Sequence, residues 1–209
     1  MSTATTAYTP EAVLAGEKII SADSHIMEPE DLWVKNLPPS LKSKYPEFPQ
    51  RNSPGEKPGG YDPRARISEM ETDGVSAEVL YPTLGLRLFA MEHAEAQEAC
   101  FQIANDWMID YCKVTPGRLI GIPMISLYNI KNAIKELERC QKAGMVGCLI
   151  WQVPPEHLSF RTDYYDPFWE AAVELEMPVS FHILTYKNRI GEARGPRINS
   201  FMSIMRGNQ

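Results

Sequence analysis

The chain has 209 residues, of which 44% are hydrophobic and 23% are charged. This balance is typical of a globular protein with a single domain or a small bipartite domain. The formal net charge of −6 and the scattered Lys and Arg residues exclude the basic surface that nucleic-acid binding requires. No apolar run reaches the roughly 18 residues of a membrane-spanning helix, so we expect no such helix.

Residues 1–17 are polar and lack the basic and apolar regions of a secretory signal, so we predict a flexible N-terminal arm. The cysteines form no CxxC pair, and they are Cys100, Cys112, Cys140 and Cys148. This pattern favours reduced, buried thiols in a cytoplasmic protein, with a disulfide or a thiolate metal site as the alternatives.

The rest of the chain alternates between apolar runs and amphipathic stretches. The apolar runs predict strands at 18–22, 77–82, 119–125, 146–151 and 178–183. The amphipathic stretches predict helices at 62–76, 93–117, 129–144 and 163–178. Gly74, Gly117 and Gly144 stand at helix ends, where glycine is common.

Strands that are apolar throughout are buried on both faces, which indicates parallel strands covered by helices and hence an α/β fold. An open doubly wound sheet and a (β/α)8 barrel both fit this order. No GxGxxG turn follows the first strand, which argues against a dinucleotide-binding sheet. A D-x-H motif follows it instead, and barrels carry their chemistry at the carboxyl ends of strands. We therefore predict about five βα units of a barrel.

A long segment at 36–62, rich in Pro, Gly and Lys, follows the first predicted strand. Loops of this length are uncommon within a compact domain. It is either disordered or a lid over the site, because the loop that follows a barrel strand emerges on the catalytic face.

Candidate metal ligands lie at two predicted strand ends. Asp23 and His25 are two residues apart, so their side chains point to the same face of a strand. His182 ends the fifth predicted strand. A carboxylate with imidazoles suits one divalent cation, with Zn²⁺ preferred and Mn²⁺ or Fe²⁺ as alternatives. Glu28 is expected to return to this site as a ligand or as a catalytic acid–base group, and His182 is expected to share in catalysis.

Other candidates surround these strand ends. Aromatic residues that would line a substrate pocket, or pack the barrel, are Tyr81, Trp151, Phe181 and Tyr186. Arg189 and Arg194 would bind a substrate carboxylate, or form a solvated basic loop. We expect His93 at the surface or capping a helix, and His157 is a weaker pocket candidate.

Five segments, "SADSHIMEPEDLW", "DGVSAEVLYPT", "NDWMIDYC", "GRLIGIPMI" and "DPFWEAAVELEMPVSFHI", resemble the amidohydrolase-related family of metal-dependent hydrolases and decarboxylases. This family includes the aminocarboxymuconate-semialdehyde decarboxylase-like enzymes. The resemblance implies a distorted (β/α)8 barrel with a single divalent metal. It places Asp23 and His25 in the ligand pair of the first strand and His182 on the fifth.

Family members are longer, and the resemblance implies a further aspartate ligand on an eighth strand that the 209 residues lack. Residues 18–209 are therefore expected to form the N-terminal part of a barrel, either self-associating or completed by a second chain. The first functional hypothesis is hydrolysis of a small-molecule ester, amide or lactone by metal-activated water. Non-oxidative decarboxylation is the alternative, and a catalytically incomplete binding or assembly piece is the third.

Overall fold

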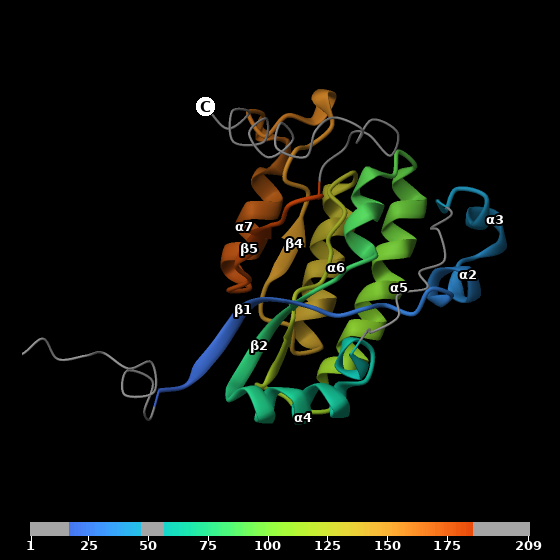
Figure 1. Cartoon of the computed structure of the whole chain (residues 1–209). Helices are drawn as coiled ribbons and strands as arrows, with labels where there is room; N and C mark the ends of the chain where they lie inside the picture. The colour runs from blue at the N-terminus through green and yellow to red at the C-terminus, as the bar shows by residue number, and fades with distance from the viewer. Residues whose placement is uncertain (1–16, 47–56, 186–209) are drawn as a thin grey trace, which may run out of the picture.

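The computed structural model describes residues 17–46 and 57–185, and its strands form one parallel series (Figure 1). They are β1 (Ile19–His25), β2 (Val75–Tyr81), β3 (Leu119–Gly121), β4 (Cys148–Ile150) and β5 (Val179–Phe181). The three-stranded sheet has the order β1-β2-β3, and β4 pairs with β5. A parallel bridge between Met124 and Leu149 connects the two sheets. The strands therefore follow one another in chain order, as in a portion of a barrel, and the predicted parallel α/β fold is confirmed.

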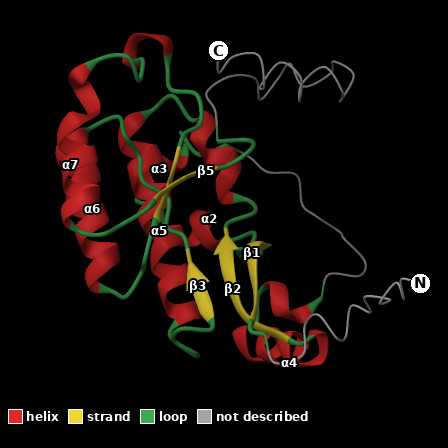
Figure 2. Cartoon of the chain, turned by 90° about the vertical axis from the view of Figure 1, so that its left-hand side faces the viewer, coloured by secondary structure: helices red, strands yellow, loops and turns green. Residues whose placement is uncertain are grey.

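The main helices separate these strands, and α5, α6 and α7 stand in a row on one side of them (Figure 2). The α-helices are α2 (Leu32–Asn36), α3 (Pro39–Lys42), α4 (Pro63–Asp73), α5 (Ala94–Cys112), α6 (Ile130–Lys142) and α7 (Asp166–Glu174). Short 3-10 helices are η1 (Pro58–Gly60), η2 (Gly85–Ala90), η3 (Glu156–Leu158) and η4 (Asp163–Tyr165).

Three helices are capped by the side chain of the first residue in the corresponding predicted helical stretch. The Asp62 carboxylate accepts from two backbone N–H groups of the first turn of α4, and Asn129 accepts from one at the start of α6. His93 caps α5 by accepting from the backbone N–H of Ala96, as predicted. Gly74 and Gly144 follow α4 and α6 with φ of 71° and 94°, which glycine adopts without steric cost.

Helix α7 ends earlier than the sequence pattern predicts. The predicted helix runs to Pro178, whereas α7 ends at Glu174. Glu176 takes a left-handed conformation with φ of 53°, and the backbone N–H of Met177 closes the end by donating to the carbonyl of Ala172. The chain therefore leaves the helix early enough to enter β5 in an extended form.

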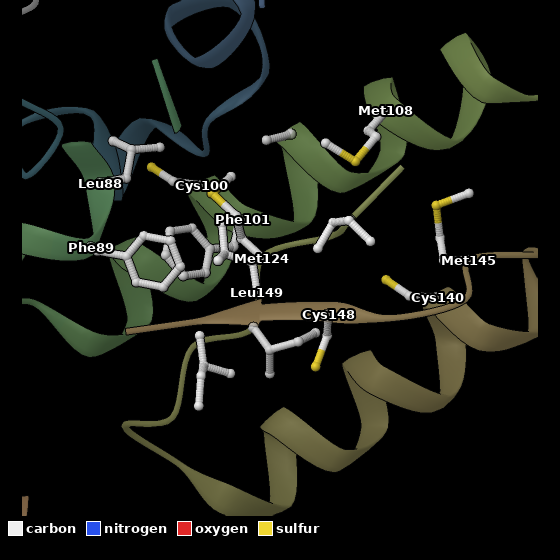
Figure 3. Packing of buried hydrophobic residues seen from close by; sticks show 14 of the residues in the cluster. Leu88, Phe89, Cys100, Phe101, Met108, Met124, Cys140, Met145, Cys148 and Leu149 are labelled. Carbon is white, nitrogen blue, oxygen red and sulfur yellow. The ribbon is translucent and has the colours of Figure 1, made fainter. Parts of the chain in front are cut away.

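The core lies between the strands and helices α5 and α6. Met124 and Leu149, the residues of the bridge, are fully buried there, with Phe89 and Phe101 packed together at a centroid distance of 4.6 Å (Figure 3). Burial of such side chains stabilises the fold by about 1.5–3 kcal/mol each. This packed layer fixes the directions of β3 and β4, and hence the edge where the strands end.

The cysteines are free and buried, as predicted. Burial raises the pKa of Cys100, Cys112 and Cys148 to about 12, and it raises the pKa of Cys140 as well. These thiols therefore stay protonated at pH 8, and a thiol reacts as its thiolate.

We predict that iodoacetamide at pH 8 alkylates almost none of the cysteines in the folded chain, and all four after denaturation. Mass spectrometry of intact protein measures the number of added groups. Rapid labelling of the folded chain at a rate near that of free cysteine would contradict the buried, protonated state.

A bulge interrupts β1 at the residues that carry the D-x-H motif. Ser21 pairs with Glu78 and Ser24 with Leu80, so β1 has one residue more than β2 over this stretch. The hydroxyls of Ser21 and Ser24 are hydrogen-bonded across the bulge at 2.7 Å. Bulges bend a strand and re-aim its side chains, and they are frequent beside active sites. Here the bulge includes Asp23.

The structure describes only the two ends of the segment at 36–62. Trp33 of α2 donates from its indole Nε1 to the carbonyl of Cys100, which fixes α2 beside α5 (Figure 1). At the other end of the segment, η1 packs against α4, and the carbonyl of Gly60 accepts from the N–H of Met27. Residues 47–56 lie outside the described residues, as do 1–16 of the predicted arm, so the lid and arm remain predictions.

Candidate metal centre

Three potential metal ligands converge where β1 and β5 end. His25 is the last residue of β1, and His182 follows β5 directly. The Nε2 atom of His182 lies 3.4 Å from Oδ1 of Asp23, and Nε2 of His25 lies 3.8 Å from the same oxygen. The three ligand atoms all lie within 4.8 Å of one another. The structure thus brings together Asp23, His25 and His182, the residues proposed as ligands.

Backbone carbonyls orient both imidazoles. Nδ1 of His25 lies 3.0 Å from the carbonyl oxygen of Pro82, and Nδ1 of His182 lies 2.7 Å from that of Ile183. A carbonyl oxygen only accepts hydrogen bonds, so each Nδ1 must carry the proton and donate it. In the neutral imidazole with this tautomer, each Nε2 carries the lone pair, and both Nε2 atoms face Asp23. This is the arrangement that metal-binding histidines adopt.

The donor set fits a divalent cation. Two Nε2 atoms and a carboxylate oxygen face one another, and each of them can bind a cation when both imidazoles are neutral. Ligand atoms about 2.1 Å from a tetrahedral ion lie about 3.4 Å apart, close to both observed separations. Nitrogen and oxygen ligands suit Zn²⁺ and Mn²⁺ alike.

The cluster is open to solvent on one side. The Asp23 side chain is 72% exposed, whereas that of His182 is 12% exposed. A cation held here would therefore keep positions for water or for an oxygen of a substrate, as catalytic rather than structural metal sites do.

Tyr81 forms one wall of the cluster. Its ring centroid lies 5.2 Å from that of His182 and 6.2 Å from that of His25. Its hydroxyl donates to Oγ of Ser180 on β5 at 3.1 Å, which ties the end of β2 to β5. Tyr81 therefore lies beside both imidazoles, and its substrate-contact role stays a prediction.

The other predicted substrate residues have different surroundings. Trp151 is buried, and its ring packs edge-on against Tyr128 at 4.9 Å, so it belongs to the core rather than to an open pocket. Tyr186 and Arg189 lie outside the described residues, as does Arg194. His157 is exposed in η3.

Glu28 does not lie where the sequence predicts it. Its side chain is only 1% exposed and is not included in the cluster of Asp23, His25 and His182. Both carboxylate oxygens accept hydrogen bonds from backbone N–H groups, those of Thr83, Leu84 and Gly85, at 2.9–3.0 Å. Burial raises the pKa of Glu28, and these donors act against that shift. With both oxygens engaged in this way, the carboxylate is a structural acceptor rather than a metal ligand.

Thr185 is a site residue that the sequence did not reveal. Its hydroxyl donates to the carbonyl of His182 at 2.8 Å and accepts from the N–H of Gln152, the second residue after β4, at 3.0 Å. Its own N–H donates to the same carbonyl of His182. Thr185 is fully buried. It therefore fixes the turn that presents His182, and its only signal in the sequence is a threonine three residues after the histidine.

Thr185→Val keeps the shape of the side chain and removes the hydroxyl. Loss of a group that orients a metal ligand costs about 10–100-fold in metal affinity. We expect about 10-fold, because the N–H of Thr185 still donates to His182. Isothermal titration with Mn²⁺ measures the change.

The matched control is Thr162→Val, since the hydroxyl of Thr162 also donates to a carbonyl three residues back, that of Ser159, away from the site. It should leave Mn²⁺ affinity unchanged. Equal losses of Mn²⁺ affinity in the two variants would contradict a specific role of Thr185 at the metal centre.

Comparison with known proteins identifies the family. Residues 31–199 match the model of the Amidohydrolase family, and the chain belongs to that family. The match begins after Asp23 and His25 of the D-x-H motif and includes His182, so only the two ligands on β1 are independent of it.

Among curated proteins, the chain is 28% identical over 123 residues to a gamma-resorcylate decarboxylase from Polaromonas sp. (strain JS666 / ATCC BAA-500). The aligned region covers 56% of this chain and 37% of that protein. The chain thus spans well under half the length of this relative.

Two solved structures share the fold. An amidohydrolase from Mycobacterium avium subsp. paratuberculosis K-10 superimposes with a TM-score of 0.68 at 18% identity, covering 80% of this chain and 59% of that one. The second is a dihydroxybenzoic acid decarboxylase from Polaromonas sp. JS666, solved with manganese and the inhibitor 2-nitroresorcinol. It superimposes with a TM-score of 0.58 at 22% identity. The superposition covers 91% of this chain and 53% of the decarboxylase chain.

Within the described residues, none of the helices is both long enough and apolar enough to cross a membrane.

Proposed function

We propose that this chain provides the metal-binding portion of a non-oxidative decarboxylase that acts on a hydroxylated aromatic carboxylate. The observation that carries the proposal is the convergence of Asp23, His25 and His182 at the ends of β1 and β5. The decarboxylases among the relatives support the lyase alternative better than the hydrolase that the sequence placed first.

A divalent cation would be held by the Asp23 carboxylate and the two Nε2 atoms, and it would supply positive charge to bind a substrate carboxylate and an adjacent oxygen. Manganese in a decarboxylase neighbour supports Mn²⁺, whereas three mixed nitrogen and oxygen ligands equally support Zn²⁺. The carbonyls of Pro82 and Ile183 keep both imidazoles in the tautomer that binds a cation.

The reaction needs no oxidant. The bond between the ring carbon and the carboxylate breaks, its electron pair stays on the ring carbon, and a proton replaces the CO₂ that leaves. Tyr81 presents an aromatic face beside both imidazoles, against which a flat substrate ring can stack. Glu28 has both oxygens bonded to the backbone, so it is poorly placed to deliver that proton.

Further polypeptide is expected on the outer strands. Ile20 on β1 and Phe181 on β5 are each more than half exposed, and exposed apolar side chains on strands promote association. We infer that a second copy or another chain covers them, which sedimentation velocity of the purified protein would detect. The free thiols support the predicted cytoplasmic location.

The test is a product assay with metal-loaded protein. Hydroxybenzoates, with 2,6-dihydroxybenzoate first, are incubated beside activated aryl esters, and CO₂, phenols and alcohols are measured. Decarboxylation predicts equal amounts of CO₂ and the matching phenol. Hydrolysis of the esters without any release of CO₂ would overturn the proposal in favour of a hydrolase. Metal binding without turnover of either class would favour the binding or assembly piece.

A further inference from the structure

A buried carboxylate closes the turn that leaves β2. Glu28 lies three residues after His25, and its side chain crosses to the neighbouring strand connection. There it accepts the backbone N–H groups of Thr83, Leu84 and Gly85. Three donors on one carboxylate offset much of the cost of burying its charge. Such a group holds several consecutive residues in one conformation.

The turn held by Glu28 is the turn that orients His25. The carbonyl of Pro82, which accepts from Nδ1 of His25, directly precedes the Thr83–Gly85 segment. The backbone N–H of Ile26 donates to the carbonyl of Tyr81 at 3.0 Å. His25 is thus tied to residues 81 and 82 through both its ring and the adjacent main chain, and Glu28 fixes the residues that come next.

The close approach depends on a glycine. A Cβ at residue 85 would lie 2.8 Å from Oε1 of Glu28 and 2.6 Å from the side chain of Met124. No side chain larger than hydrogen fits there without movement. The absence of a side chain at Gly85 is a second, independent feature that allows the turn to close on the carboxylate.

We propose that Glu28 is a positioning residue of the metal centre: it fixes the turn after β2 so that the carbonyl of Pro82 holds the His25 imidazole with the proton on Nδ1 and the lone pair on Nε2. The role in metal binding rests on the proposed function, whereas the control of the tautomer does not. If the turn moves, the Nδ1–H loses its acceptor. A proton on Nε2 would then block that atom as a ligand.

The test reads the tautomer directly, in metal-free protein. Long-range ¹H–¹⁵N NMR distinguishes the two tautomers of each imidazole, and the chain has only four histidines. In the wild type, His25 and His182 should both carry the proton on Nδ1. In Glu28→Gln, the amide group cannot accept all three N–H bonds. We expect the Nε2–H form of His25 to become the major one, while His182 stays unchanged.

Gly85→Ala disturbs the same contact from the opposite side and should shift His25 in the same direction, which keeps the proposal testable if Glu28→Gln does not fold. The matched control is Glu136→Gln, because Glu136 is another buried carboxylate, bonded to Asn105 and Arg139 away from the site. It should lower stability without changing the His25 signals.

The affinity for Mn²⁺ distinguishes the positioning role of Glu28 from the proposed metal centre. We expect Mn²⁺ to bind Glu28→Gln about 10–100-fold more weakly than the wild type, as for loss of a group that orients a ligand. A folded Glu28→Gln or Gly85→Ala variant with an unchanged His25 tautomer would overturn the positioning role. A changed tautomer in a chain whose wild type binds no metal would support the positioning role and reject the metal centre.

Discussion

His182→Ala is expected to weaken Mn²⁺ or Zn²⁺ binding by at least about 100-fold, beyond the roughly 10–100-fold cost of losing an outer partner. His182 contributes the Nε2 atom closest to Asp23, at 3.4 Å, and its side chain is the more buried of the two imidazoles. Without it, only two of the three converging ligands remain. Isothermal titration of metal-free protein measures the affinity, and circular dichroism checks the fold.

His157→Ala is the matched control, since His157 is exposed in η3 and is not included in the cluster. It should bind metal like the wild type. If His157→Ala loses as much affinity as His182→Ala, the metal binds elsewhere, and the cluster at the ends of β1 and β5 is not the site.

Trp33→Ala is expected to destabilise the fold by about 3–5 kcal/mol, the usual cost of removing a buried large aromatic side chain. Trp33 is fully buried, its Nε1 donates to the carbonyl of Cys100 on α5 at 2.9 Å, and its ring stacks on that of Tyr45. Truncation leaves a cavity and detaches α2 from α5. Urea denaturation followed by circular dichroism measures the free energy of unfolding.

Trp33→Phe separates the two contributions, because it retains most of the ring and loses only the indole N–H. It should cost clearly less than Trp33→Ala. A loss below about 1 kcal/mol for Trp33→Ala would show that α2 does not contribute to the stability of the core, contrary to its burial against α5.

The strands and helices could be predicted because their signals are local. Apolar runs and helical periodicity depend on residues close in sequence, and caps such as Asp62 and Asn129 act within a few residues. The early end of α7 could not be predicted, since it depends on the left-handed turn at Glu176, and glutamate does not signal such a turn.

The site was predictable only for side chains at strand ends. Asp23, His25 and His182 could be grouped because parallel strands end at one edge of a sheet. The bulge in β1 has no comparable sequence signal. Glu28 was assigned to the wrong surroundings because its partners are backbone N–H groups more than fifty residues away, and backbone donors are the same for every sequence.

The residues alone could not distinguish hydrolysis from decarboxylation. A carboxylate and two imidazoles can hold a cation for hydrolysis or for decarboxylation, because both reactions use it to bind and polarise oxygen atoms. The proposal of the second reaction therefore rests on the decarboxylases among the similar proteins, and the product assay tests it. The residues that would distinguish the two contact the substrate, and two predicted ones, Tyr186 and Arg189, lie outside the described residues.

The most direct test of the metal centre is anomalous diffraction at the manganese edge from crystals grown with Mn²⁺. We predict one strong peak per chain, about 2.0–2.2 Å from Oδ1 of Asp23 and from Nε2 of both His25 and His182. A strong peak at another position, or no peak between these three atoms in Mn²⁺-saturated crystals, would contradict the metal centre and the function proposed from it.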